Sequence, residues 1–126
     1  MRYLLDSTLL IDHANADPAA GRLLERLFDE GHELYTCAVV TCETLSRGEE
    51  SELRPVRALL EALEYVATSP SAAAWAGESR RHRHAEGGKR GLGDALIAGL
   101  AREIGATVVT RNRPDFERQG VPVLGY

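Results

Sequence analysis

The sequence has little cysteine, no excess of positive charge and no long apolar run. Its two cysteines, Cys37 and Cys42, have no Cys or His partners at zinc-ligand spacing. One cysteine pair does not staple a domain of this size, so we expect both to be small buried hydrophobic residues. The absence of about eighteen consecutive apolar residues argues against a transmembrane helix, and Asp6 and Asp12 interrupt any signal-peptide core. We therefore expect a cytoplasmic protein with no membrane partner.

The charge balance is slightly acidic. Fifteen Lys and Arg stand against nineteen Asp and Glu, which gives a formal net charge of -4, and 44% of the 126 residues are hydrophobic. Such a composition disfavours a disordered chain, and the length predicts a single domain over residues 1–126. An acidic domain offers no bulk attraction to nucleic acid, so any contact with RNA or DNA must be local.

Short apolar runs alternate with helical stripes along the chain. We predict strands at 3–5, 34–37, 65–68, 107–110 and 121–124, the last limited to a sheet edge by Pro122. Between them we predict helices from Pro18 to near Gly31, around Glu43, across 53–63, from Pro70 through His84, and from Leu92 to Ile104. This alternation predicts a three-layer α/β/α fold with a mostly parallel central sheet of about five short strands.

Four carboxylates are expected at one edge of this sheet. Asp6 ends the first strand, Glu43 follows the second, Asp94 lies near a helix start, and Asp115 follows the fourth strand. In open α/β sheets, ligands bind beyond the carboxyl ends of the strands. Crowded carboxylates raise one another's pKa and stay ionised mainly beside a cation. Their oxygen atoms, with no thiolate or imidazole nearby in the pattern, suit Mg²⁺ or Mn²⁺ rather than zinc.

Each of these acids also has a structural interpretation. Asp6 fits a loop acid or the N-cap of a helix over 8–11, Asp94 fits a favourable charge at a helix N-terminus, and Asp115 fits a solvated turn. Glu43 stands among apolar neighbours and needs a partner if it is buried. Spacing alone leaves these alternatives open.

Four segments resemble the motifs of PIN-domain proteins, and within them of the VapC-type toxins of bacterial toxin-antitoxin pairs. The segments are 3–8, 39–48, 93–101 and 110–116. The first resembles an opening hydrophobic strand followed by an acid and a small hydroxyl residue, and the second resembles an acid with a glycine about five positions later. The third is the most specific, because it resembles an Asp-Ala start to a helix of small and apolar residues. The fourth resembles the closing motif, and the four span almost the whole chain in the expected order.

The resemblance implies a metal-dependent endoribonuclease with a PIN-like fold. Asp6 and Asp94 match the surest metal ligands, Glu43 is a third catalytic acid, and family members place the fourth acid either where this chain has Asn112 or where it has Asp115. One or two Mg²⁺ or Mn²⁺ ions would activate a water for in-line attack on a phosphodiester, so that no covalent nucleophile is needed.

Hydroxyl, amide and basic side chains complete this expected site. Ser7, Thr110 and Asn112 would orient ligands, with ordinary capping and strand-end roles as the alternative for the two hydroxyls. Five basic residues precede Asp94 with one acid, Glu86, among them; they are Arg80, Arg81, Arg83, Lys89 and Arg90. These side chains would hold RNA phosphates, or would form a solvated helix face and loop. His82 and His84 fit one helix face poorly and are not expected to bind metal.

The resemblance also implies partners, and other functions remain open. A VapC-type toxin has a cognate antitoxin protein whose peptide covers the site, and is often a homodimer; the stripe at 53–63 would line that groove or, with better reason, the core. The alternative function is a catalytically inactive PIN-like module that binds RNA or protein. A phosphoacceptor receiver domain is disfavoured because it would have an Asp after the third strand, which here runs into Thr68-Ser69-Pro70. An Asp-x-Asp phosphotransferase is disfavoured because Thr8 occupies the position of the second Asp.

Overall fold

The protein is built around a five-stranded, all-parallel sheet. The computed structural model describes residues 1–88 and 91–126. The strands are β1 (Arg2–Leu5), β2 (Glu33–Thr36), β3 (Glu64–Tyr65), β4 (Thr107–Val109) and β5 (Val123–Leu124), in the order β3-β2-β1-β4-β5. This confirms the predicted α/β fold, with β5 at an edge. β3 is shorter than the predicted 65–68, because only Glu64 and Tyr65 pair with β2.

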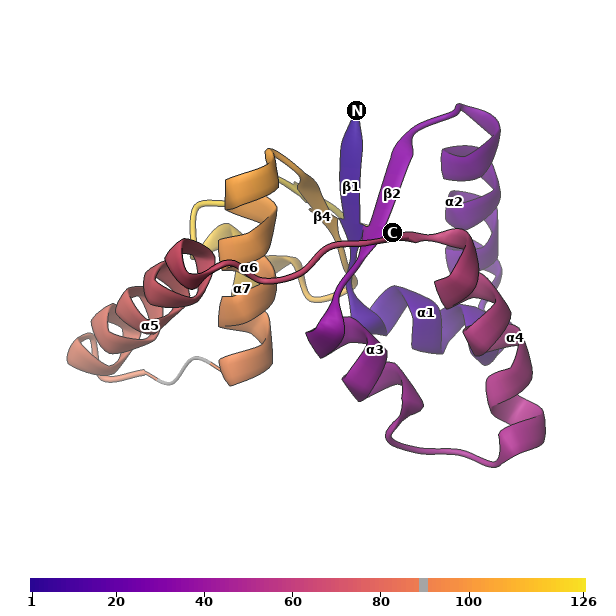
Figure 1. Cartoon of the computed structure of the whole chain (residues 1–126), viewed down its shortest axis with the longest axis horizontal. Helices are drawn as coiled ribbons and strands as arrows, with labels where there is room; N and C mark the ends of the chain where they lie inside the picture. Colours follow the sequence, from indigo (N-terminus) through magenta and orange to yellow (C-terminus); the bar gives the residue numbers. More distant parts are fainter. Residues whose placement is uncertain (89–90) are drawn as a thin grey trace.

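Helices cover both faces of this sheet. They are α1 (Ser7–Ala14), α2 (Pro18–Asp29), α3 (Ala38–Leu45), α4 (Glu50–Ala62), α5 (Pro70–Ala85), α6 (Leu92–Ile104) and α7 (Arg113–Glu117). Figure 1 shows α1, α2 and α4 on one side of β1 and β2, and α5, α6 and α7 on the other. Near the lower ends of the strands, α3 packs against α1, α4 and α6. No helix of the described ranges is long and apolar enough to cross a membrane.

Local sequence signals set the helix boundaries. The Asp17 side chain accepts a hydrogen bond from the Ala20 N–H at 2.9 Å and caps α2, while Ser69 caps α5 in the same way. A proline follows each of these caps, which suits the first helical position. Gly105 ends α6 with φ 67°, a left-handed conformation that glycine adopts without strain.

The core holds α6, and with it the first turn that carries Asp94. Apolar residues of β1, β4, α1 and α6 are completely buried, among them Leu4, Val108, Leu9 and Ile97. On its other side α6 approaches α5 so closely that a β-carbon on Gly99 would lie 2.6 Å from the Ala72 carbonyl oxygen. Close packing on both sides leaves α6 little freedom to shift.

The two cysteines differ in environment. Cys37 is buried as predicted, but the prediction was wrong for Cys42, which is exposed; both are free. Helix α3 buries Val40 and Thr44, and Cys42 lies two residues from each, on the opposite side of the helix.

Candidate active site

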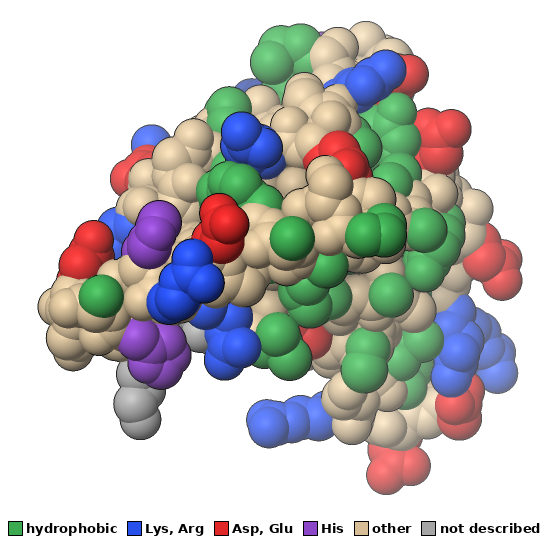
Figure 2. All heavy atoms as spheres, turned by 60° about the vertical axis from the view of Figure 1, so that its left-hand side comes forward, with side chains coloured by type: hydrophobic (Ala, Val, Ile, Leu, Met, Phe, Trp, Pro, Cys, Tyr) green, Lys and Arg blue, Asp and Glu red, His purple; other side chains and the backbone are tan. Residues whose placement is uncertain are grey.

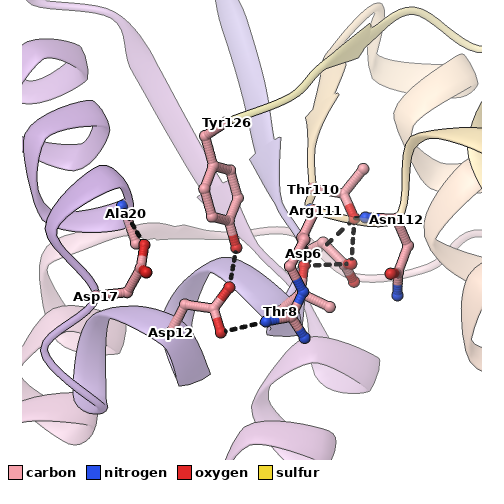
Figure 3. Close-up of polar contacts among 9 residues, drawn as sticks. All are labelled: Asp6, Thr8, Asp12, Asp17, Ala20, Thr110, Arg111, Asn112 and Tyr126. Atoms are coloured by element: carbon pink, nitrogen blue, oxygen red, sulfur yellow. Dashed lines mark hydrogen bonds and ion pairs between the residues drawn. The ribbon is translucent and has the colours of Figure 1, made fainter.

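Asp6 lies at the carboxyl end of β1, where the strand passes into α1. It occupies the N-cap position of α1, yet its side chain caps no backbone N–H. Instead, its Oδ2 atom accepts hydrogen bonds from the hydroxyl groups of Thr110 at 2.7 Å and Thr8 at 3.0 Å (Figure 3). The residue is 2% exposed. Asp6 is therefore a buried carboxylate held by neutral donors, which is a different role from helix capping.

The hydroxyl groups beside Asp6 connect β4 to α1. Thr110 is completely buried, and its Oγ1 also accepts a hydrogen bond from the Asn112 N–H at 3.0 Å. The Thr8 hydroxyl lies 3.3 Å from that of Thr110 and accepts from the Arg111 N–H. The predicted supporting residue Thr110 thus contacts Asp6 directly, while Asn112 contributes its backbone and keeps an exposed side chain. Thr8 is a site residue that was not predicted; its signal in the sequence is a hydroxyl two residues after the acid.

Glu43 on α3 faces the start of α6. Its Oε1 accepts a hydrogen bond from the Ser7 hydroxyl at 3.3 Å. Its Oε2 lies 3.1 Å from the point where a β-carbon on Gly93 would sit, so the glycine allows this approach. Although the residue is exposed overall, partial loss of hydration at the carboxyl group and the negative charge of Asp6 raise the pKa of Glu43.

Asp94 lies in the first turn of α6, where the negative charges of the three other acids act on its carboxyl group. It is half-buried, and burial raises its pKa from 3.8 to about 6, with further contributions from the charges of Asp6, Asp115 and Glu43. The structure therefore gathers the four predicted acids at one edge of the sheet. One follows β1, and the other three come from α3, α6 and α7.

Asp115 belongs to this group less tightly than the others. Its side chain is 51% exposed in the short helix α7, and its Oδ1 lies 3.9 Å from the guanidinium of Arg118. Asn112 is exposed at the N-cap of the same helix and makes no side-chain capping bond. Both candidates for the fourth position thus lie on one loop and helix after β4.

The donor chemistry of this group fits a divalent cation. Carboxylate oxygens are hard ligands of the kind that Mg²⁺ and Mn²⁺ prefer. Among the described residues, basic side chains form no ion pair with Asp6, Glu43 or Asp94. Within the same ranges, no three His, Cys, Asp or Glu side chains converge closely enough to hold a metal ion. Ion binding would therefore have to draw the carboxylates together.

A basic surface lies at the end of α5. Arg80, Arg81 and Arg83 lie in the last turns of this helix, and Arg83 pairs with Glu86 at 3.8 Å. Figure 2 shows Arg and His side chains gathered at this end of the molecule. The predicted contacts Lys89 and Arg90 lie outside the described residues.

A groove of about 810 Å³ opens beside the acids, between α1, α3 and α4. Ser7 and Glu43 line it together with the apolar side chains of Ile11, Leu53 and Val56. The other half of the stripe at 53–63 packs on the core through Leu59, Leu60 and Leu63. One part of the stripe at 53–63 therefore lines the groove, and the other part packs on the core.

A second polar cluster lies next to Asp6, and no sequence motif indicated it. Asp12 on α1 is 8% exposed. Its Oδ1 accepts a hydrogen bond from the Arg111 guanidinium at 2.7 Å, and its Oδ2 accepts one from the Tyr126 hydroxyl at 2.6 Å (Figure 3). The three residues come from α1, the segment after β4 and the segment after β5, so only the fold brings them together.

Comparisons with known proteins agree with this fold. The family model for the PIN domain matches residues 3–121. The ribonuclease VapC19 of Mycobacterium tuberculosis is 33% identical over 116 residues, covering 90% of each chain. Two solved structures are similar over nearly their whole length. VapBC2 from Rickettsia felis, bound to a DNA fragment from its promoter, has a TM-score of 0.85 at 24% identity, covering 100% of this chain and 99% of that one. DNA-bound VapBC from Salmonella typhimurium has a TM-score of 0.82 at 25% identity, covering 99% and 98%.

Proposed function

This chain belongs to the PIN-domain family, and from that premise we propose that it is a metal-dependent endoribonuclease toxin of the VapC type. Residues 1–126 would act as one catalytic domain. The observation that carries the proposal is the position of Asp94 at the carboxyl edge of the sheet, where burial and the charges of three other acids raise its pKa. Such a concentration of negative charge suits a cation site and is unfavourable without one.

Asp6 and Asp94 would hold the ion, with Glu43 beside them and either Asn112 or Asp115 as the fourth group. A bound Mg²⁺ or Mn²⁺ lowers the pKa of a coordinated water and stabilises negative charge on a phosphodiester. The protein supplies the ligand positions. Thr110 and Thr8 fix one oxygen of Asp6, which orients the carboxylate and satisfies its charge in a buried setting.

Glu43 and the start of α6 form the opposite wall of the site. The Ser7 hydroxyl holds one oxygen of Glu43, and Gly93 leaves room for the other next to Asp94. An ionised Glu43 in this position accepts a proton from a water aligned with the phosphate, which is the requirement of a general base. Its raised pKa makes it a better proton acceptor than an ordinary glutamate.

The substrate would be held by local positive charge outside the acids. Arg80, Arg81 and Arg83 on α5, with Lys89 and Arg90 in the segment before α6, are the proposed phosphate contacts. This arrangement explains how a chain with a net charge of -4 can bind RNA. These contacts would bind the RNA backbone and would not by themselves select an RNA sequence.

The test is cleavage of end-labelled RNA by the purified chain with and without Mg²⁺. We expect Mg²⁺-dependent cleavage that falls at least 100-fold in Asp6→Asn and in Asp94→Asn. Asp29→Asn removes the same charge from an exposed site at the end of α2, on the opposite edge of the sheet, and should keep full activity. A wild-type chain that binds RNA but cleaves none would identify the alternative, an inactive PIN-like binding module.

An antitoxin is the proposed protein partner. The groove between α1, α3 and α4 joins apolar side chains to Ser7 and Glu43, so a peptide lying in it would also cover the acids. Ile11 lines this groove and is 39% exposed. The substitution Ile11→Glu should release inhibition by the antitoxin, the product of the neighbouring reading frame, without lowering RNA cleavage. We also propose a homodimer located in the cytoplasm, which light scattering and cell fractionation would test.

A further inference from the structure

The side chain of Asp12 is committed to two partners from distant parts of the chain. It is buried, and both of its oxygens are occupied, one by Arg111 and one by Tyr126. Burial and the hydrogen bond to Asp12 raise the pKa of the Tyr126 phenol, which keeps it a proton donor. Removing a carboxylate from water is unfavourable unless its partners are well placed. Asp12 therefore fixes the positions of the Arg111 guanidinium and the Tyr126 phenol.

Arg111 is only partly used by this contact. Its guanidinium bonds Asp12 through one nitrogen, while 58% of its side chain remains exposed. A guanidinium has five N–H donors. Within the described residues, that of Arg111 makes no hydrogen bond besides the one to Asp12. Figure 3 shows Arg111 adjacent to Thr8 and Asp6, and its backbone N–H bonds Thr8, which in turn bonds Asp6. A pre-oriented cation with free donors thus stands at the rim of the acidic site.

We infer that Arg111 binds a phosphate of the RNA backbone next to the one attacked, and that Asp12 and Tyr126 are positioning residues for its guanidinium. This inference rests on the proposed function. The four acids repel every phosphate near them, so the neighbouring phosphate requires a cation of the protein close to the acids. An arginine held in one orientation loses less side-chain entropy on binding than a free one.

The contact with Asp12 does not oppose this role. A single charge-assisted bond of 2.7 Å aims the guanidinium and leaves its other nitrogens open to phosphate oxygens. The rival interpretation is that Arg111 only neutralises Asp12 and joins α1 to β4. If Arg111 binds a phosphate, Arg111→Gln changes KM and the salt dependence of cleavage. If Arg111 only neutralises Asp12, the same substitution changes thermal stability alone.

The experiment compares initial rates of cleavage of a fluorescein-labelled, single-stranded oligoribonucleotide in Mg²⁺ at several salt concentrations. We expect Arg111→Gln to raise KM roughly tenfold with little change in kcat. The slope of log(kcat/KM) against log[salt] should become shallower by about 0.7, the value for one phosphate contact on a single strand. Arg111→Lys should recover part of the loss, because it keeps the charge but not the fork.

Positioning is tested with Tyr126→Phe, which removes one hydroxyl and leaves all charges in place. KM should rise about threefold, with kcat and the salt slope unchanged. Arg26→Gln is the matched control, since Arg26 on α2 is 59% exposed, pairs with Glu30, and lies at the opposite edge of the sheet. Its KM and salt slope should equal those of the wild type.

Binding of the same oligonucleotide in Ca²⁺, measured by anisotropy, separates this inference from the proposed function. If the wild type cleaves RNA and Arg111→Gln shows an unchanged KM and salt slope, the inference is overturned while the function stands. If the wild type binds without cleavage and Arg111→Gln weakens binding about tenfold, the inference stands and the function fails. A wild type that neither binds nor cleaves overturns both.

Discussion

Replacing Asp94 with asparagine should stabilise the metal-free protein while removing its activity. The Asp94 carboxyl has a pKa of about 6 instead of 3.8 because burial and three neighbouring acids oppose its ionisation. The folded state therefore holds a proton more tightly than the unfolded state does. The free energy of unfolding is reduced in full above about pH 6, and the loss disappears as the pH falls through 6 towards 3.8.

The size of this effect follows from the pKa difference. At 1.36 kcal/mol per pKa unit, moving from 3.8 to about 6 corresponds to at most about 3 kcal/mol. Asp94 is only half-buried, so solvent screening reduces this to about 1.5 kcal/mol. Loss of a negative charge in the first turn of α6 removes about 0.5 kcal/mol of helix-dipole stabilisation. We expect Asp94→Asn to gain about 1 kcal/mol, or roughly 4 °C in Tm.

The assay is thermal unfolding of wild type, Asp94→Asn and Asp29→Asn in EDTA at pH 7.5 and at pH 4. Asp94→Asn should be the more stable protein at pH 7.5 and lose most of that advantage at pH 4, whereas Asp29→Asn should stay within about 0.5 kcal/mol of the wild type at both. Excess Mg²⁺ should raise the Tm of the wild type more than that of Asp94→Asn. An Asp94→Asn variant less stable than the wild type at pH 7.5, or an advantage independent of pH, would refute the reasoning.

Two further substitutions test the contacts that position the acids. Thr110→Val removes the hydroxyl that donates to buried Asp6 at 2.7 Å; it should destabilise the fold by about 1–3 kcal/mol and weaken Mg²⁺ binding at least tenfold by calorimetry, with Thr110→Ser close to wild type. Gly99→Ala places a β-carbon 2.6 Å from the Ala72 carbonyl oxygen and should cost about 1–3 kcal/mol in urea unfolding. Gly77→Ala, which meets no atom within 4 Å on α5, should instead be neutral or stabilising by up to about 1 kcal/mol; equal losses for both glycine variants would contradict the packing argument.

Local signals predicted most of the fold. Caps such as Asp17-Pro18 and Ser69-Pro70, the stop at Gly105 and the apolar run before Asp6 have physical effects that depend on near neighbours. The order of strands and helices then placed the carboxyl ends at one edge. The exposure of Cys42 was not predictable in this way, because it depends on which side of an eight-residue helix meets the core.

The site was predictable only as far as it is local. The acids follow strands or open helices, so their shared edge came from topology. Contacts across the sheet could not be foreseen, because Thr110 meets Asp6, and Tyr126 meets Asp12, more than a hundred residues away in the chain. A hydroxyl after a strand has many ordinary roles. Which residue such a hydroxyl contacts depends on how neighbouring strands are aligned, and the sequence alone does not give that alignment.

The distribution of charge connects the acids to the inferred role of Arg111. Apart from Asp6, Glu43, Asp94 and Asp115, the chain has equal numbers of acidic and basic side chains, 15 of each. The net negative charge therefore belongs to the site itself, and a divalent cation held there would bind the attacked phosphate directly. One such cation offsets only two of the four negative charges, so the next phosphate along the strand still meets a net negative charge. A fixed guanidinium at the rim, such as that of Arg111, meets that need without adding a positive charge among the metal ligands.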